Sequence, residues 1–371
     1  MNGIISKILF PTASRAVNTR NIFTKDYLGL SFIQEKQNES RAKAGKNAVK
    51  IKDIFLKSYK QKGIKGLKRY DILNFMHLVD GEKDMTNLCR VAEDFLAQAG
   101  DPKHKTYLLC KCIQTCYLRG DLKYSRLLSE GAFFQPFDKN PIAILTQFQL
   151  EYDHGNYQEL VDKFKTTTKA RNAAQMTIIV ASLCRIGTAE AYKQATEFRA
   201  DEFLIPKEVE SSRALELFAW SNIQKGHYDT ALETLKKKKK QPFNNSEKIR
   251  ANVILFALVK SGNVDVCLST ISNELKKSSK FGFIPTYSYE LLGEIAKAVK
   301  HDEKLTQMYK ELPNDLEEKG KMDNATVEEL VFRPISVSPH SISSDKSFYN
   351  PNSYVDPTRV RKLESRDLFD E

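Results

Sequence analysis

The stretch SSRALELFAWSNIQKGHYDTALETL, residues 211–235, has the pattern of a helix, a glycine turn and a second helix. Gly226 closes an apolar run of helical length, and an amphipathic run follows it within a few positions. A glycine at the end of a helix readily adopts the left-handed conformation that other L-residues adopt poorly. This stretch therefore predicts one helix–turn–helix unit.

The unit recurs along the chain. Gly226 is one of six glycines that follow apolar runs, at intervals of 39, 35, 32, 39 and 36 residues: Gly81, Gly120, Gly155, Gly187, Gly226 and Gly262. A further pair without a glycine spans Thr286 to about Glu317, with His301 in the turn position. Helix pairs repeated at about 35 residues are typical of an α-solenoid, because one pair cannot bury its own apolar faces. We therefore expect an all-α fold, an α-solenoid of pentatricopeptide- or tetratricopeptide-like helix pairs, with essentially no β-sheet.

The chain divides into a leader (1–25), a basic helical arm (26–69), the repeat array (70–332) and a mobile polar tail (333–371). The leader carries Lys7, Arg15, Arg20 and Lys25 and no acid, beside a short apolar side. This pattern predicts a mitochondrial transit peptide and a matrix location, with an ordinary N-terminus as the alternative. No stretch is apolar over about 18 residues, so we expect no membrane span.

The arm is strongly basic. Between Arg41 and Arg69 there are eleven lysines and arginines against one acid, Asp53. Apolar residues at helical spacing within it, Ile51, Ile54, Phe55 and Tyr59, predict a helix that docks on the array while its lysines face outward. The net charge of +11 favours an anionic partner such as RNA, although solubility alone could explain it. The candidate phosphate contacts are Lys60, Lys62, Lys65, Lys68 and Arg69.

The repeats resemble pentatricopeptide repeats, most closely at SSRALELFAWSNIQKGHYDTALETL (211–235) and SEKIRANVILFALVKSGNVDVCLSTI (246–271). The layout resembles the mitochondrial pentatricopeptide repeat domain-containing protein 2 family: a transit peptide, a basic arm with KGLK (65–68), a first repeat FMHLVDGEKDMTNLCRVAEDF, and a polar tail. The resemblance implies a matrix protein that binds mitochondrial RNA, acts in its maturation and processing together with other RNA-processing proteins, and so supports the respiratory chain.

That resemblance also implies base-reading positions. Such repeats read one base each with a polar side chain on the first helix and another at the repeat junction. Ten residues before the glycines, only Thr177 and Asn252 are of the expected type, with Ser211 and Thr286 at the matching junctions. The other four positions are Asp71, Cys110, Leu145 and Glu216. A full base-reading code is therefore absent.

No catalytic signature is present: the sequence has no HExxH, GxxxxGK[ST] or GxSxG motif. Cys112 and Cys116 lie one helical turn apart with His104 nearby, but the spacing lacks paired zinc ligands and favours core packing. We expect no enzymatic activity, metal or cofactor. The alternative function is a mitochondrial solenoid scaffold that binds proteins, in ribosome or respiratory-chain assembly, since the repeat length fits tetratricopeptide units as well.

Overall fold

A computed structural model describes residues 21–98, 102–130, 140–166, 173–200, 212–236, 246–281 and 285–336. The fold is all-α. The helices begin with α1 (Leu30–Ala44), α2 (Ala48–Lys62), α3 (Arg69–Leu78), α4 (Glu82–Gln98), α5 (Pro102–Arg119), α6 (Leu122–Ser129), α8 (Pro141–Asp153) and α9 (Tyr157–Thr166). They continue with α10 (Ala173–Ile186), α11 (Ala189–Ala200), α12 (Ser212–Gln224), α13 (Tyr228–Lys236), α14 (Ser246–Lys260), α15 (Val264–Phe281), α16 (Tyr289–Val299), α17 (Glu303–Tyr309), α18 (Leu312–Glu318) and α19 (Val327–Val331).

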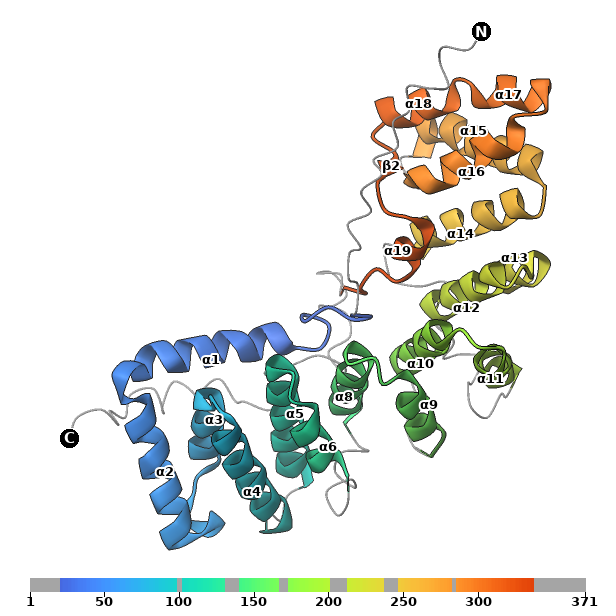
Figure 1. The fold of residues 1–371 in the computed structure, drawn as a ribbon. Coiled ribbons are helices and arrows are strands. Elements are labelled where there is room, and N and C mark those ends of the chain that lie inside the picture. Colours follow the sequence, from blue (N-terminus) through green and yellow to red (C-terminus); the bar gives the residue numbers. More distant parts are fainter. Residues whose placement is uncertain are drawn as a thin grey trace.

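Consecutive helices from α3 to α17 form pairs, and the pairs lie one after another in an elongated array (Figure 1). The first helix of each pair packs against the first helix of the next, in the series α5, α8, α10, α12, α14 and α16. Second helices also bridge neighbouring pairs, as α9 does to α10 and α13 does to α14. Each pair therefore buries its apolar faces against its neighbours, as repeat stacking requires.

All six glycines lie between the two helices of a pair, and five of them have the expected left-handed conformation. Gly120, Gly155, Gly187, Gly226 and Gly262 all have a positive φ, between 68° and 85°. At Gly226 the turn is closed by two backbone hydrogen bonds, from Gly226 to Ile223 (3.0 Å) and from His227 to Asn222 (2.9 Å). The sixth, Gly81, also lies between two helices, α3 and α4, but its φ lies outside the left-handed region and it directly precedes α4. His301 does lie in the turn between α16 and α17.

The first helices form the centre of the core. Every residue of α12 from Ser212 to Ile223 is buried, and so are ten consecutive residues of α8. The second helices α9 and α13 instead bury one face and expose the other. A helix buried on all sides carries apolar residues around most of its circumference, which explains the long apolar runs before the glycines. Asn140 starts α8 by accepting hydrogen bonds from the backbone N–H groups of Ile142 and Ala143.

The arm folds into α1 and α2, and it docks on the array as predicted. Phe55 is buried and stacks on Phe75 of α3, with 4.5 Å between ring centroids. Tyr59 donates a hydrogen bond to Asp94 of α4. One predicted docking residue is wrong: Ile54 is 57% exposed, because it lies on the outer face of α2. Gly63, with φ of 62°, ends the helix.

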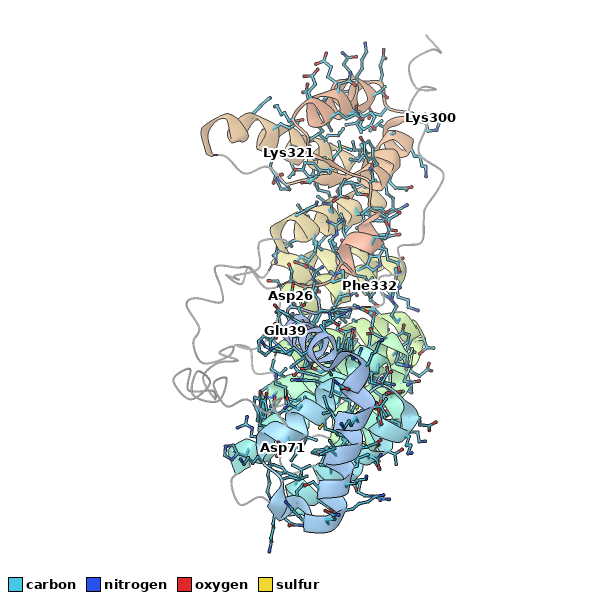
Figure 2. The ribbon with its side chains drawn as sticks, turned by 90° about the vertical axis from the view of Figure 1, so that its left-hand side faces the viewer. Asp26, Glu39, Asp71, Lys300, Lys321 and Phe332 are labelled. Atoms are coloured by element: carbon cyan, nitrogen blue, oxygen red, sulfur yellow. The ribbon has the colours of Figure 1, made fainter. Side chains whose placement is uncertain are left out.

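Two segments that are far apart in the sequence meet in the middle of the array. Phe23 and Ile335 form a parallel β-bridge, and both are buried. Asp26 and Phe332 mark the two segments near mid-length of the molecule (Figure 2). We call residues 22–28 and 327–335 together the clasp. The folded structure thus extends past both predicted boundaries, into the leader at Ile22 and into the tail at Ile335; residues 337–371 lie outside the described part of the chain.

Regular strand structure within the described ranges is limited to two short strands, β1 (Tyr287–Ser288) and β2 (Met322–Asp323), which pair in parallel. They join the segment before α16 to the segment before α19. Within these same ranges, no helix combines the length and the apolar character that crossing a membrane requires.

Candidate nucleic-acid interface

The arm presents a group of exposed lysines at the end of α2 and in the segment that leads to α3. Lys60, Lys62, Lys65 and Lys68 are all exposed, and within the described residues none of them forms an ion pair. Elsewhere on the arm, Lys52 is half-buried and pairs with Asp84 at 2.5 Å. Exposed lysines without carboxylate partners keep their full charge toward solvent, so this surface is suited to phosphate contacts.

Arg69 differs from these four lysines although it ends the same run. It lies in the first turn of α3, it is half-buried, and its guanidinium carbon is 4.1 Å from the centroid of the Tyr107 ring. Its Nε atom is buried and has no hydrogen-bond acceptor. The sequence prediction grouped Arg69 with the lysines, whereas the structure places it against α5.

Asn252 lies in the interior of the array. Its side chain is 0% exposed, and its amide nitrogen donates to the backbone carbonyls of Lys248 and Thr286, both at 2.8 Å. Its amide oxygen accepts from the backbone N–H of Ser288 at 2.8 Å. These contacts use the whole amide to hold the start of β1 and α16. Asn252 therefore cannot pair with a base in this arrangement, which corrects the predicted role.

The other predicted readers are also not arranged as a reading surface. Thr177 is 1% exposed, and its hydroxyl donates to the carbonyl of Ala173 at 2.7 Å, so the prediction fails for the same reason. Thr286 is half-buried and contributes its backbone carbonyl to Asn252. Ser211 lies outside the described residues. The structure brings Asn252 and Thr286 together, but as partners of each other.

The clasp covers part of the surface formed by the first helices. Gln149 of α8 accepts hydrogen bonds from the backbone N–H groups of Ile22 (3.1 Å) and Phe23 (3.0 Å). Arg213 of α12 donates to the carbonyls of Leu330 (3.1 Å) and Val331 (2.9 Å). Gln149 thus binds the backbone at the start of the clasp, and Arg213 binds the carbonyls at the C-terminal end of α19.

Two further contacts hold the clasp. Gln114 of α5 donates to the carbonyl of Leu28 at 2.7 Å. Arg185 of α10 pairs with Glu328 at 3.2 Å and lies over the ring of Phe332, 3.8 Å from its centroid. These contacts could not be predicted from the sequence, because a polar residue on an apolar helix belongs to no motif that identifies its partner.

Glu151 of α8 is a buried charge, 0% exposed, that several side chains contact. Arg126 donates two hydrogen bonds to it, at 2.8 and 2.6 Å, and Lys163 lies 3.2 Å from it. Burial alone would raise the pKa of Glu151, but the hydrogen bonds from Arg126 and Asn156 and the charge of Lys163 hold that pKa below its usual value. Arg126, Asn156 and Lys163 together satisfy the carboxylate, so it has no free oxygen for chemistry. The network therefore serves to join α6, α8 and α9.

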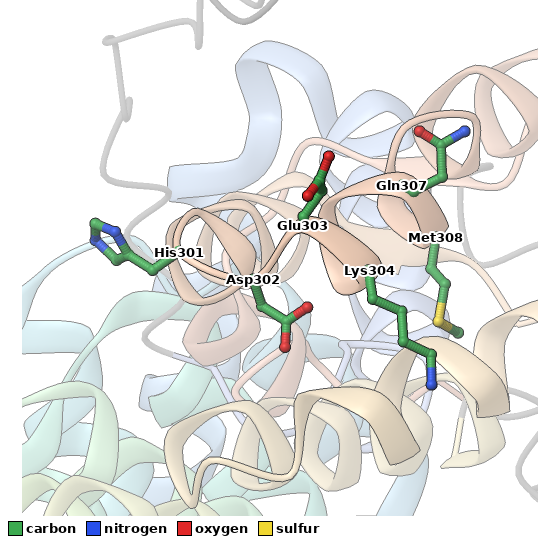
Figure 3. A pocket seen from close by; sticks show the side chains of 6 residues that line it. All are labelled: His301, Asp302, Glu303, Lys304, Gln307 and Met308. Atoms are coloured by element: carbon green, nitrogen blue, oxygen red, sulfur yellow. The ribbon is translucent and has the colours of Figure 1, made fainter.

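The surface depression along α17 does not have the features of a nucleic-acid site. It is lined by His301, Asp302, Glu303, Lys304, Gln307 and Met308, all exposed, and their side chains point in different directions (Figure 3). Asp302 is already used to cap α17, accepting from the N–H of Leu305 at 2.9 Å. Cys112 and Cys116 are buried in α5, and the described part of the chain holds no cluster of three or more His, Cys, Asp or Glu side chains suited to a metal ion.

The chain was compared with protein-family models, with curated proteins and with solved structures, and none of them matches it.

Proposed function

We propose that this chain is a mitochondrial α-solenoid of pentatricopeptide type that binds single-stranded RNA through its basic arm and acts in mitochondrial RNA maturation. The repeat period of about 35 residues and the recurring positive-φ glycine turns support the repeat type. The basic composition and the acid-free leader support the compartment and the ligand.

The observation that carries the proposal is the group of unpaired lysines on the arm. Lys60, Lys62, Lys65 and Lys68 project from a segment that is itself anchored by Phe55 and Tyr59, so their backbone is fixed while their charges are exposed. Phosphate contacts of this kind give affinity without sequence selection. The burial of Asn252 and Thr177 supports the same view, in which the backbone of the RNA supplies most of the binding energy.

The proposed leader has to end early in the chain. Ile22 and Phe23 are buried in the core, at 2% and 1% exposure, and Leu28 is 0% exposed. A protease that cut after residue 25 would remove two core residues and the partners of Gln149. We therefore expect the mature protein to begin at or before Asn21, and N-terminal sequencing of protein recovered from mitochondria would test this.

The experiment that tests RNA binding is a salt titration. The affinity of the full chain for labelled oligouridylate is measured by fluorescence anisotropy at several salt concentrations. The logarithm of the binding constant falls as the logarithm of the salt concentration rises. Replacing Lys60, Lys62, Lys65 and Lys68 by glutamine should make this dependence less steep, by about 0.7 for each phosphate that is no longer bound. The matched control replaces four exposed lysines at the far end of the array: Lys300, Lys304, Lys310 and Lys319.

The control has the same net charge as the arm variant, so a difference between them reports the location of the phosphate-binding surface. An equal decrease of affinity in both variants would contradict an RNA path along the arm. Wild-type protein that binds no RNA at moderate salt would contradict the proposed function altogether.

A second candidate is a mitochondrial solenoid scaffold that binds proteins, in ribosome or respiratory-chain assembly. The clasp favours it, because Gln149 and Arg213 already bind backbone groups of this chain's own segments. On this hypothesis, partner binding would be insensitive to the arm lysines and would show little dependence on salt. The titration described above therefore separates the two candidates.

A further inference from the structure

Three cations and two aromatic rings alternate across α1, α5 and α3. Lys36 Nζ lies 5.8 Å from the centroid of the Phe32 ring, and Lys111 Nζ lies 5.9 Å from the same centroid. Lys111 Nζ also lies 5.4 Å from the centroid of the Tyr107 ring. The guanidinium carbon of Arg69 lies 4.1 Å from that same centroid. We call these five residues the cation–ring ladder.

Two of the ladder cations lack a carboxylate. Among the described residues, every other cation that lies over a ring also forms an ion pair: Lys36 with Glu39, Lys123 with Glu82, Arg185 with Glu328 and Lys260 with Glu294. Neither Arg69 nor Lys111 has an ion pair in the same parts of the chain. Lys111 donates to the side-chain oxygen of Gln114 at 3.1 Å, and Arg69 Nε is buried without an acceptor.

These two charges are partly removed from water. Arg69, Tyr107 and Lys111 are all half-buried. Burial lowers the pKa of Lys111 below its usual value, and the nearby charge of Arg69 acts in the same direction. Two cations held near each other in a partly dry site repel each other, and an anion that contacts both would offset the repulsion and the lost hydration.

The other end of the ladder is open to solvent. Phe32 is 39% exposed, although it is a large apolar side chain, and the Lys36 side chain is 42% exposed. An exposed ring beside a cation is the arrangement on which a nucleobase stacks in proteins that bind single strands. The ladder is also continuous with the arm, since Arg69 directly follows the exposed Lys68.

We propose that the cation–ring ladder binds one nucleotide of single-stranded RNA, with a phosphate contacted by Arg69 and Lys111 and a base stacked against the exposed part of the Phe32 ring. The inference rests on the proposed RNA binding and extends it by naming a site that combines charge with stacking. Arg69 supplies a planar fork suited to phosphate oxygens, and Lys111 supplies a point charge.

The charge contribution is tested with Lys111→Gln and Arg69→Gln in the full chain. Each should weaken binding of labelled oligouridylate about five- to tenfold. Each should also make the dependence of log K on log salt less steep, by about 0.7. The matched control is Lys123→Gln, which also removes a cation from a ring, but one that Glu82 already neutralises. The control should keep the wild-type affinity and slope. Circular dichroism of each variant checks that it is folded.

The stacking contribution is tested with Phe32→Leu and an RNA that carries 2-aminopurine, whose fluorescence is quenched when the base stacks. The variant should bind about tenfold more weakly, show less quenching and keep the wild-type salt slope, because no charge is removed. Arg69→Lys should restore the slope that Arg69→Gln reduces, while the affinity recovers only in part because the planar fork is absent.

The outcomes separate the two proposals. If RNA binds but Lys111→Gln and Arg69→Gln behave like Lys123→Gln, the ladder assignment is overturned while RNA binding stands. If the wild-type chain binds no RNA, both are overturned. Displacement of the RNA by AMP at matching concentration would overturn the assignment to a strand in favour of a mononucleotide site.

Discussion

Phe23 and Ile335 lie near opposite ends of the chain and form a parallel β-bridge in the middle of the array. The N–H of Thr24 donates to the carbonyl of Ile335 at 3.0 Å, and the N–H of Ile335 donates to the carbonyl of Ile22 at 2.8 Å. Both segments also bind side chains of the first helices. These two segments therefore hold each other and the array together, which a linear stack of repeats does not require.

Truncation of the clasp should destabilise the array. A chain that stops after residue 336 keeps every described contact, whereas a chain that stops after residue 326 lacks α19 and leaves the buried Arg213 without its two acceptors. We expect the free energy of unfolding of the shorter chain, measured by urea denaturation, to fall by at least about 3 kcal/mol. Equal urea midpoints for the two truncated chains would refute a structural role for the clasp.

Serine substitutions at two glycines should separate backbone strain from packing. Gly226 has φ of 79°, and a Cβ atom there would meet no other atom within 4 Å. Gly226→Ser should therefore destabilise the chain by about 1 kcal/mol through strain alone. Gly81 has the same open space but no left-handed φ, so Gly81→Ser should be nearly neutral. Similar melting temperatures for both variants would contradict the explanation.

Much of the array could be predicted from the sequence, because glycine spacing and helical periodicity report local geometry. Gly120, Gly155, Gly187, Gly226 and Gly262 all lie in the expected turns. Gly81 also lies between two helices but lacks the left-handed φ, because a glycine can precede a helix as well as end one. The docking of Phe55 followed from its spacing, but the exposure of Ile54 depends on the position of α2 relative to α3, which spacing does not give.

The clasp and the ladder could not be predicted in this way. The clasp joins segments that are distant in sequence, and neither carries a pairing signal. In the ladder, the spacing of Tyr107 and Lys111 places them on one face of α5, but Phe32 and Arg69 come from other helices. The base-reader prediction failed because position within a repeat does not reveal burial: Asn252 stands at the expected offset and is used for packing.

Substitution of Asn252 should therefore affect folding and leave RNA selection unchanged. Asn252→Leu has a similar volume but leaves the carbonyl of Thr286 and the N–H of Ser288 without partners in the interior. We expect the unfolding free energy to fall by about 2 kcal/mol or more. RNA affinity, measured below the melting temperature for oligonucleotides of different base composition, should match the wild type. A change in base preference without a decrease in stability would restore the reading role.

Acid should destabilise the junction between α1, α3 and α5 through His77. This side chain is half-buried, and its Nδ1 lies 3.4 Å from the Ser40 hydroxyl. Burial, together with the charges of Lys111 and Lys36, lowers the pKa of His77 from 6.5 to about 4. The unfolded chain therefore binds a proton that the folded chain does not bind between these two values, so stability falls as the pH drops through this window and is unaffected by His77 above it.

His77→Gln removes that dependence, because glutamine does not titrate. Between pH 7 and pH 4.5 the unfolding free energy of the wild type should fall by about 2 kcal/mol more than that of the variant, measured by urea denaturation at both pH values. Carboxylates such as Glu151 also lose their stabilising charge in acid, but they do so equally in both proteins, and the difference cancels them. The exposed His301 provides the matched substitution, and its variant should follow the wild type. If His77→Gln has the same pH dependence as the wild type, the imidazole does not need to be neutral for this junction to pack.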